Sequence, residues 1–175
     1  ENLLRLTRLD SGVVQQPYPV AVGPVLERVE RMLTMVAQEK GVTVSGAADE
    51  DAVALATDDD VHQILYNLME NAIKYSAPSE GFVRAEAHVD GDRVVLTVSD
   101  NGIGIPDEDL PHIFDRFYRV DKMRSREVGG TGLGLSIVKD TIENRGGTIA
   151  ADHGPDGVGT VFTVRLPLAE RGEEA

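Results

Sequence analysis

The sequence contains no cysteine, so disulfide bonds and thiol chemistry are excluded. It also has no apolar run close to the roughly 20 residues that a membrane-spanning helix needs, and no signal peptide opens it. Basic residues are scarce, because 17 lysines and arginines stand against 30 aspartates and glutamates, for a formal net charge of −13. A surface of this charge repels nucleic acid and anionic lipid at long range, which argues against either as a partner.

The length of 175 residues, 41% of them hydrophobic, suits one globular domain with its own core. The chain opens with Glu1 rather than Met, and four leucines in residues 3–9 recur at helical spacing. We expect residues 1–18 to be the end of a helix plus a proline-containing linker, 19–168 to be the domain, and 169–175 to be a polar tail. We also expect a longer parent protein, with any membrane anchor upstream of this chain.

Hydrophobic periodicity predicts an α+β domain built from helices and hairpins. Helices are expected from Val22 to about Lys40, from the aspartates at 58–60, which are expected to cap the helix, to about Tyr75, and after the glycines near residue 132. The β-rich segments are expected to pair in chain order: 42–46 with 52–57, 82–89 with 93–100, and 147–154 with 159–168. Residues 121–130 show no periodicity and are expected to form a mobile loop.

The stretch YNLMENAIKYS carries two asparagines inside an expected helix. Asparagine is unfavourable there because its amide competes for backbone hydrogen bonds. Asn67, Asn71 and Lys74 are four and three residues apart, so they share one helix face. An amide oxygen can ligate Mg²⁺, and a lysine can balance phosphate charge. A solvated polar face is the alternative. The opposite face is expected to be buried through Val61, Ile64, Leu65, Leu68, Ala72 and Tyr75.

Two glycine-rich segments could surround a ligand. In SDNGIGIP a strand ends at Asp100, and a carboxylate at this position can accept a hydrogen bond from an amine such as adenine N6, although a tight turn is the alternative. In GGTGLGLSIVK glycines lead into a helix, whose first N–H groups and dipole bind phosphate. The Walker A, Rossmann and H-R-D or D-F-G kinase motifs do not occur.

A basic island interrupts the acidic chain. Between Arg116 and Arg126 five basic residues stand against only Asp121. Such an island is a candidate anion site, and a solvated loop is the alternative reading.

Taken together, these motifs and their order resemble the ATP-binding catalytic domain of bacterial sensor histidine kinases. The N-x-x-x-N helix, the D-x-G-x-G loop, FDRFYR, the GTGLGL helix start and G-x-G-T-x-F at 157–162 match the N, G1, F, G2 and G3 boxes. The likeness covers about residues 19–168 and extends to the superfamily of gyrase, Hsp90 and MutL. It implies the Bergerat (GHKL) fold, a two-layer α/β sandwich. In that fold the sheet is mixed and largely antiparallel, helices pack on one face, and an ATP lid is mobile.

The resemblance also implies which residues bind ATP and Mg²⁺. Asn71 would ligate the metal, with Asn67 on its phosphate side, and Asp100 would receive adenine N6–H. Asn67, Asn71, Lys74 and Arg119 are the implied catalytic residues. The implied nucleotide-binding set is Asn67, Asn71, Lys74, Tyr75, Asp100, Gly102, Gly104, Ile105, Tyr118, Arg119, Gly130, Thr131, Gly132, Leu133, Gly134, Leu135 and Thr160.

By the same resemblance, the chain is the catalytic part of a protein histidine kinase that sends the γ-phosphoryl group to a histidine and then to a response regulator. The four histidines are His62, His88, His112 and His153, and none has the H-E-L-R-T-P context of a phosphoacceptor. We therefore expect the acceptor in an upstream dimerisation region, the fragment to be a monomer, and the full-length protein to be a membrane-anchored dimer with this domain in the cytoplasm.

Two other functions remain open at this point: a stand-alone serine kinase of the anti-sigma type, and a nucleotide-sensing module without catalysis. The related hydrolases usually place a glutamate where this chain has Asn67, and that glutamate acts as the general base. Glu70 lies about 100° away from the line through Asn67 and Asn71 on the helix and is a poor substitute. We therefore expect little intrinsic ATP hydrolysis.

Overall fold

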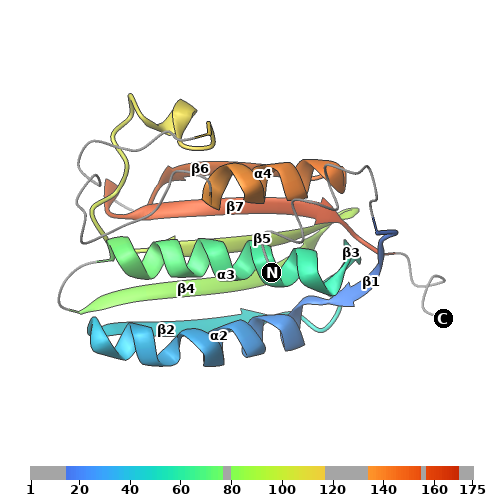
Figure 1. The fold of residues 1–175 in the computed structure, drawn as a ribbon. Coiled ribbons are helices and arrows are strands. Elements are labelled where there is room, and N and C mark those ends of the chain that lie inside the picture. Colours follow the sequence, from blue (N-terminus) through green and yellow to red (C-terminus); the bar gives the residue numbers. More distant parts are fainter. Residues whose placement is uncertain (1–14, 77–79, 117–133, 155–156, 170–175) are drawn as a thin grey trace.

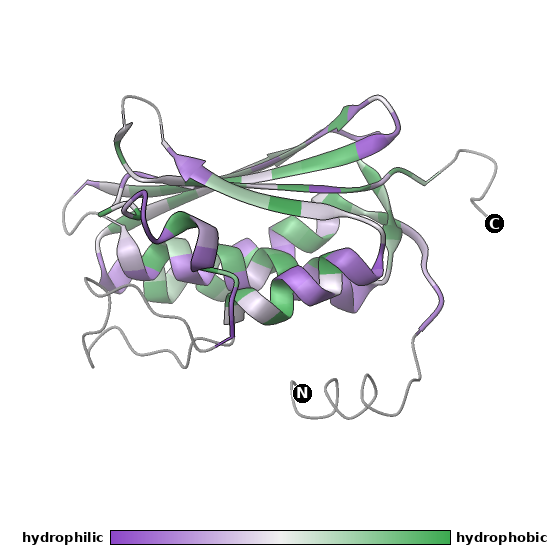
Figure 2. Ribbon diagram, turned by 90° about the horizontal axis from the view of Figure 1, so that it is seen from above, coloured by the Kyte–Doolittle hydropathy of each residue, from purple (hydrophilic) through white to green (hydrophobic). Residues whose placement is uncertain are grey.

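The computed structural model describes residues 15–76, 80–116, 134–154 and 157–169, and these form an α/β sandwich with helices on one face of a sheet (Figure 1; Figure 2). The sheet has five strands in the order β2-β4-β5-β7-β6, and a separate pair is formed by β1 and β3. The elements are β1 (Tyr18–Ala21), α2 (Val22–Glu39), β2 (Val42–Ala48), β3 (Val53–Ala56), α3 (Asp58–Tyr75), β4 (Gly81–Asp90), β5 (Arg93–Asp100), the short 3₁₀ helix η1 (Leu110–His112), α4 (Gly134–Asn144), β6 (Thr148–His153) and β7 (Thr160–Pro167).

The main sheet is mixed and largely antiparallel, as expected. Only β2 and β4 run parallel, and the pairs β4–β5, β5–β7 and β6–β7 are antiparallel. Gly91 turns the β4–β5 hairpin with a φ of 62°, a backbone angle that favours glycine. The predicted hairpins at 82–100 and 147–168 are thus confirmed.

The predicted pairing of β2 with β3 is wrong. β2 runs along β4, whereas β3 pairs antiparallel with β1, in the segment that we expected to be a linker. Pro17 and Pro19 hold that segment extended, and proline is tolerated at a sheet edge because it lacks an N–H. The acidic turn between β2 and β3 is hydrogen-bonded to β4 and to the start of α2. Asp49 N donates to Ala87 O, and Val22 N donates to Ala52 O, both at 3.0 Å.

The core lies between the inner face of the sheet and α2, α3 and α4. The expected stripe of α3 is buried through Val61, Ile64, Leu65, Leu68 and Ala72, and Tyr75 packs against the core while half-exposed. The cap of α3 differs from the expectation: Thr57 is the N-cap, its hydroxyl accepts from Asp60 N, and the Asp60 carboxylate accepts from Thr57 N. The three aspartates form the first turn instead, where the helix dipole favours negative charge.

A buried ion pair joins α3 to the end of α4. Arg145 Nε donates to Asp60 Oδ2 at 2.6 Å, and their side chains are 8% and 4% exposed. Asp60 lies in the first turn of α3 and Arg145 directly follows α4, so the two helices are antiparallel neighbours (Figure 1). The first residues of α4 therefore lie toward the end of α3 that carries Asn71.

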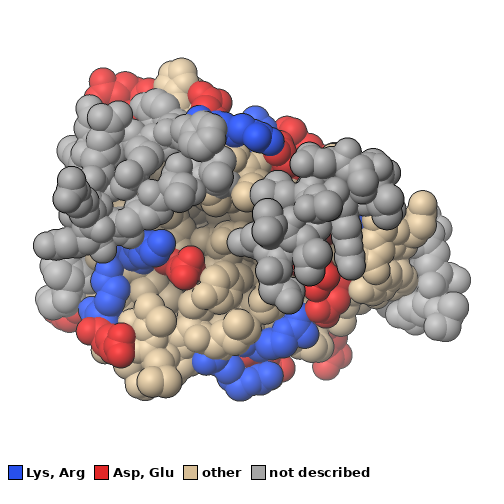
Figure 3. Space-filling view, in the orientation of Figure 1, with Lys and Arg blue, Asp and Glu red and all other residues tan. Residues whose placement is uncertain are grey.

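The surface of the helix-bearing face mixes charges of both signs. Figure 3 shows acidic and basic side chains interspersed there, with uncharged surface between them, where the described residues are visible. Buried and exposed residues alternate along β4, as expected for a sheet with one solvated face. None of the helices in the described residues is both long and apolar enough to cross a bilayer.

Candidate nucleotide site

The candidate site lies where the last turn of α3, the loop after β5 and the turn before β7 meet. Ile103 N donates to Tyr75 O at 3.1 Å, which ties the glycine loop to the end of α3. Gly102 makes this approach possible, because a Cβ there would lie 1.7 Å from Tyr75 O. Tyr75 and Gly102 are thus brought together by backbone contacts, and Asp100 joins them because its side-chain Oδ1 accepts from Gly102 N.

Asp100 lies at the base of this site. Asp100 is only 5% exposed, and its Oδ1 accepts from Gly102 N at 2.8 Å. Thr160, also 5% exposed, is its register partner on β7. Burial raises the pKa of Asp100 to about 6, although hydrogen bonds from the backbone N–H groups of Gly102 and Thr160 act in the opposite direction. The ionised carboxylate is poorly solvated, so it gains from any further donor that a ligand supplies.

Two glycines that lie near each other shape the same corner. Gly159 has a φ of 74°, and a Cβ there would lie 1.9 Å from Asp100 O. Gly104 has the same φ of 74°, and a Cβ there would meet Gly159 O at 3.4 Å. Ile105, which follows, is buried at 6% exposure. Our sequence reasoning assigned no role to Gly159, although the G-V-G-T motif contains it.

Asn67, Asn71 and Lys74 lie on one face of α3, as their spacing predicts, and this face is half-buried. The side-chain amides of Asn67 and Asn71 have no hydrogen-bond partner among the described residues. The backbone carbonyl of Lys74 accepts from Lys40 Nζ at 2.8 Å. Glu70 does not join this face, because Tyr66 Oη donates to its carboxylate at 3.4 Å. The asparagine amides are therefore available to a ligand.

A metal at this site would depend on such amides. Within the described ranges, no group of three or more His, Cys, Asp or Glu side chains could hold a metal ion. One amide oxygen together with the oxygens of a bound phosphate chain is a donor set that suits Mg²⁺, which binds hard oxygen ligands and keeps several of its waters.

The segment after the glycine loop is anchored to the core by aromatic contacts. Ile113 is 5% exposed, and the Phe114 ring meets Phe162 edge-on with ring centroids 6.2 Å apart. From α4, the Lys139 ammonium lies 5.9 Å from the Phe114 ring centroid. Arg116 forms an exposed ion pair with Asp140 at 3.8 Å, so part of the basic island contacts α4.

Some predicted residues lie outside the described part of the chain. These are Tyr118, Arg119, Gly130, Thr131, Gly132 and Leu133, together with most of the basic island and the expected loop at 121–130. Gly134 is the first residue of α4, with open space where a Cβ would be, and Leu135 is half-buried against the core. The predicted helix start is thus observed only from Gly134 onward.

One contact near the site was missed by sequence reasoning. His153 Nε2, at the end of β6, lies 2.5 Å from Asp107 Oδ1, just after the glycine loop. The hydrogen bond with Asp107 raises the pKa of His153. The two residues are 46 positions apart, and no local pattern links them.

The sequence that builds this site matches a known family. The profile of the histidine kinase-, DNA gyrase B-, and HSP90-like ATPases matches residues 56–170. The chain belongs to this family. The sensor histidine kinase WalK of Bacillus subtilis (strain 168) is 40% identical over 176 residues, which cover 99% of this chain and 28% of WalK.

Solved structures agree on the fold. Full-length ShkA in complex with AMPPNP has a TM-score of 0.78 and 29% identity, covering 95% of this chain and 34% of ShkA. The mycobacterial sensor histidine kinase MprB has a TM-score of 0.73 and 27% identity, covering 85% of this chain and 97% of the solved MprB chain. The expected fold and family are confirmed: this is the ATPase-type catalytic domain of sensor histidine kinases, and it spans less than a third of the length of WalK.

Proposed function

We propose that this domain binds Mg-ATP and, within a longer sensor histidine kinase, transfers the γ-phosphoryl group to a histidine outside this chain. The observation that carries the proposal is the buried Asp100 carboxylate, which Gly102 N–H holds in place at the floor of a corner made by backbone contacts. A family match to ATPases supports the same ligand class.

At the adenine end, Asp100 accepts a hydrogen bond from the exocyclic N6 amine. Gly102 and Gly159 keep the backbone close around that carboxylate, and the buried Ile105 gives the base an apolar neighbour. Because an ionised acceptor is held in a poorly solvated place, an amine donor is strongly preferred to a carbonyl at the same position of the base.

At the phosphate end, Asn71 is the proposed Mg²⁺ ligand, with Asn67 beside it and Lys74 balancing phosphate charge. The two amides share one helix face and have no hydrogen-bond partner in the described part of the chain, which fits an oxygen-ligating cation bound together with phosphate. When bound, Mg²⁺ neutralises charge between the β- and γ-phosphates. Tyr118, Arg119 and the glycines before α4 complete the proposed site.

The transfer step needs positioning more than covalent chemistry from this domain. The helix face holds the phosphate chain, and the acceptor histidine supplies the nitrogen that attacks the γ-phosphorus as the bond to the β-phosphate oxygen breaks. Asn67 cannot take a proton from water near neutral pH, so hydrolysis is slow and the phosphoryl group is kept for the histidine.

In the longer protein, the acceptor histidine lies on the protein's own dimerisation region, a response regulator receives the phosphoryl group, and an upstream segment anchors the protein in the membrane. A stand-alone serine kinase is less well supported, because the relatives described above are sensor histidine kinases.

Radiolabelled ATP tests the proposal. The 175-residue chain incubated with γ-labelled ATP should take up no label, whereas the protein extended by its preceding sequence should gain label that acid removes and alkali does not. Acid-stable label on a hydroxyl would indicate a serine kinase instead, and acid-labile label on the short chain alone would contradict the proposed location of the acceptor.

A further inference from the structure

The edge strand β2 has a free side. Within the described residues its one partner in the sheet is β4, and its other edge carries unpaired backbone groups. Proteins usually protect such edges with proline or with charged side chains, especially lysine. β2 reads VTVSGAA and contains none of these, and the residues from Ser45 to Ala47 are exposed.

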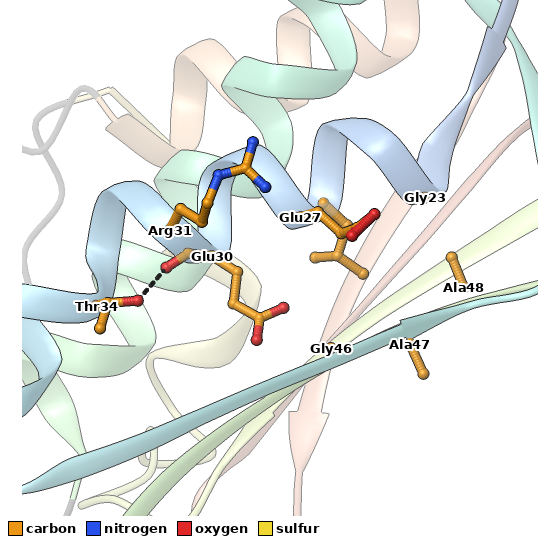
Figure 4. A pocket seen from close by; sticks show the side chains of 9 residues that line it. Gly23, Glu27, Glu30, Arg31, Thr34, Gly46, Ala47 and Ala48 are labelled. Carbon is orange, nitrogen blue, oxygen red and sulfur yellow. Dashed lines mark hydrogen bonds between the residues drawn. The ribbon is translucent and has the colours of Figure 1, made fainter.

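A hollow of about 460 Å³ lies between this strand and α2. Its floor includes Gly46 and Ala48, and Leu26, Glu30 and Thr34 of α2 line its wall (Figure 4). A Cβ at residue 46 would lie 2.9 Å from Glu30 Oε1 and 3.1 Å from Leu26 Cδ2. The glycine therefore keeps the space between helix and strand open.

Two glutamates and one arginine, Arg31, line the hollow, so its charge is net negative. Glu30 points from α2 toward β2, whereas Arg31 points away from the strand (Figure 4). Glu27 also lines the hollow, and within the described part of the chain neither glutamate forms an ion pair. The exposed acidic turn of residues 49–51 continues directly from the strand. Negative charge thus follows the free edge along its helix side and at its end.

We propose that the free edge of β2 binds an extended, basic segment of a partner protein, which adds to the sheet as a further strand. Backbone hydrogen bonds to β2 supply the affinity, and alternate side chains of the added strand face α2. A lysine or arginine among these would enter the hollow beside Glu30, whose carboxylate forms no ion pair with the described residues.

This surface is separate from the nucleotide site. In the register of the sheet, Ala48 lies across from Ala87 and Ala87 across from Leu96, whereas Asp100 lies across from Val83. The hollow is therefore on an outer strand, two strands away from β5, in register rows two to four residues from that of Asp100. A partner bound there leaves the nucleotide site open, so the inference does not depend on the proposed function.

The test uses the 175-residue chain and a blocked seven-residue peptide that alternates valine and lysine, matched to the seven residues of β2. Binding is followed by fluorescence anisotropy and by amide chemical shifts. We expect saturable binding, with shift changes confined to β2 and the facing side of α2. A peptide with the same sequence but N-methyl groups on alternate amides keeps its charge and loses one set of backbone hydrogen bonds, so its affinity should fall at least tenfold.

Two variants test the roles of the charge and of the open space, and a third is the control. Glu30→Gln should weaken binding about two- to fivefold, as expected for one exposed or half-buried ion pair. Glu39→Gln removes the same charge from the same helix outside the hollow and should have no effect. Gly46→Val, which fills the hollow with a residue suited to strands, should abolish binding while the circular dichroism spectrum stays native.

Three results would overturn the proposal. Equal binding of the N-methylated peptide would show nonspecific attraction to an acidic protein. Shift changes away from β2 would place the contact elsewhere. Concentration-dependent dimerisation that Gly46→Val abolishes would show that a second copy of the chain occupies the edge.

Discussion

Replacement of Asp100 by asparagine should stabilise the domain and at the same time weaken nucleotide binding. The amide keeps an oxygen that can accept from Gly102 N, but it removes the charge that burial disfavours. It also places an NH₂ donor opposite the N6 amine of adenine. Two donors facing each other should weaken ATP binding about 10- to 100-fold, the effect of leaving a buried donor unpaired.

The size and sign of the stability change follow from the pKa of Asp100. Burial raises it from 3.8 to about 6, so the folded state holds the proton more tightly than the unfolded state. The stability that this proton contributes is fully present below pH ~3.8 and is lost as the pH rises through ~6. At pH 8 the ionised carboxylate therefore costs up to ~3 kcal/mol, and at pH 4.5 about 1 kcal/mol.

This stability difference is measured by urea denaturation of the wild type and of Asp100→Asn, without nucleotide, at pH 8 and at pH 4.5. Asp100→Asn should be the more stable protein at pH 8, and its advantage should shrink by about 2 kcal/mol at pH 4.5. An advantage that does not change with pH, or a variant less stable than the wild type at pH 8, would refute the argument that burial of this charge is costly.

Other predictions address the metal, the backbone and the buried ion pair. Asn71→Ala should remove the increase in ATP affinity that Mg²⁺ causes, measured by calorimetry with MgCl₂ and with EDTA, and an unchanged Mg²⁺ effect would exclude it as a ligand. Gly159→Ala should cost more than ~2 kcal/mol in urea and impair ATP binding, because its Cβ would lie 1.9 Å from a backbone oxygen. Gly157→Ala, with a similar φ of 75° and nothing within 4 Å, should cost only about 1 kcal/mol and spare binding. Arg145→Ala removes the guanidinium that pairs with the buried Asp60 carboxylate and should cost about 3 kcal/mol in thermal or urea unfolding, and a change below ~1 kcal/mol would show that the pair is dispensable.

The features that could be predicted from sequence are those that depend on the spacing of residues close together in the chain. The interval between Asn67 and Asn71 placed both amides on one face of α3, and the strand that runs into Asp100 placed the carboxylate at its end. The short turn around Gly91 fixed the β4–β5 hairpin. In each case the residues that determine the structure are close along the chain, so periodicity and turn chemistry suffice.

Contacts between distant segments could not be predicted in this way. The partner of β3 is β1, some 35 residues earlier in the chain, and the proline-containing segment looked like a linker because extended strands and linkers share local signals. The pair of Asp60 with Arg145 spans 85 residues, and each residue alone is an ordinary surface type. The close approach of Gly159 to Asp100 likewise exists only once β5 and β7 are paired.

The central claim, that Asp100 reads the exocyclic amine of an adenine nucleotide, is tested most directly by calorimetric titration of the chain with ATP and with GTP at equal Mg²⁺. Guanine presents a carbonyl where adenine presents its amine, so it would face the carboxylate with a second acceptor. The account predicts saturable binding of one ATP per chain and at least 100-fold weaker binding of GTP. Equal affinity for the two nucleotides, or no binding of ATP, would contradict it.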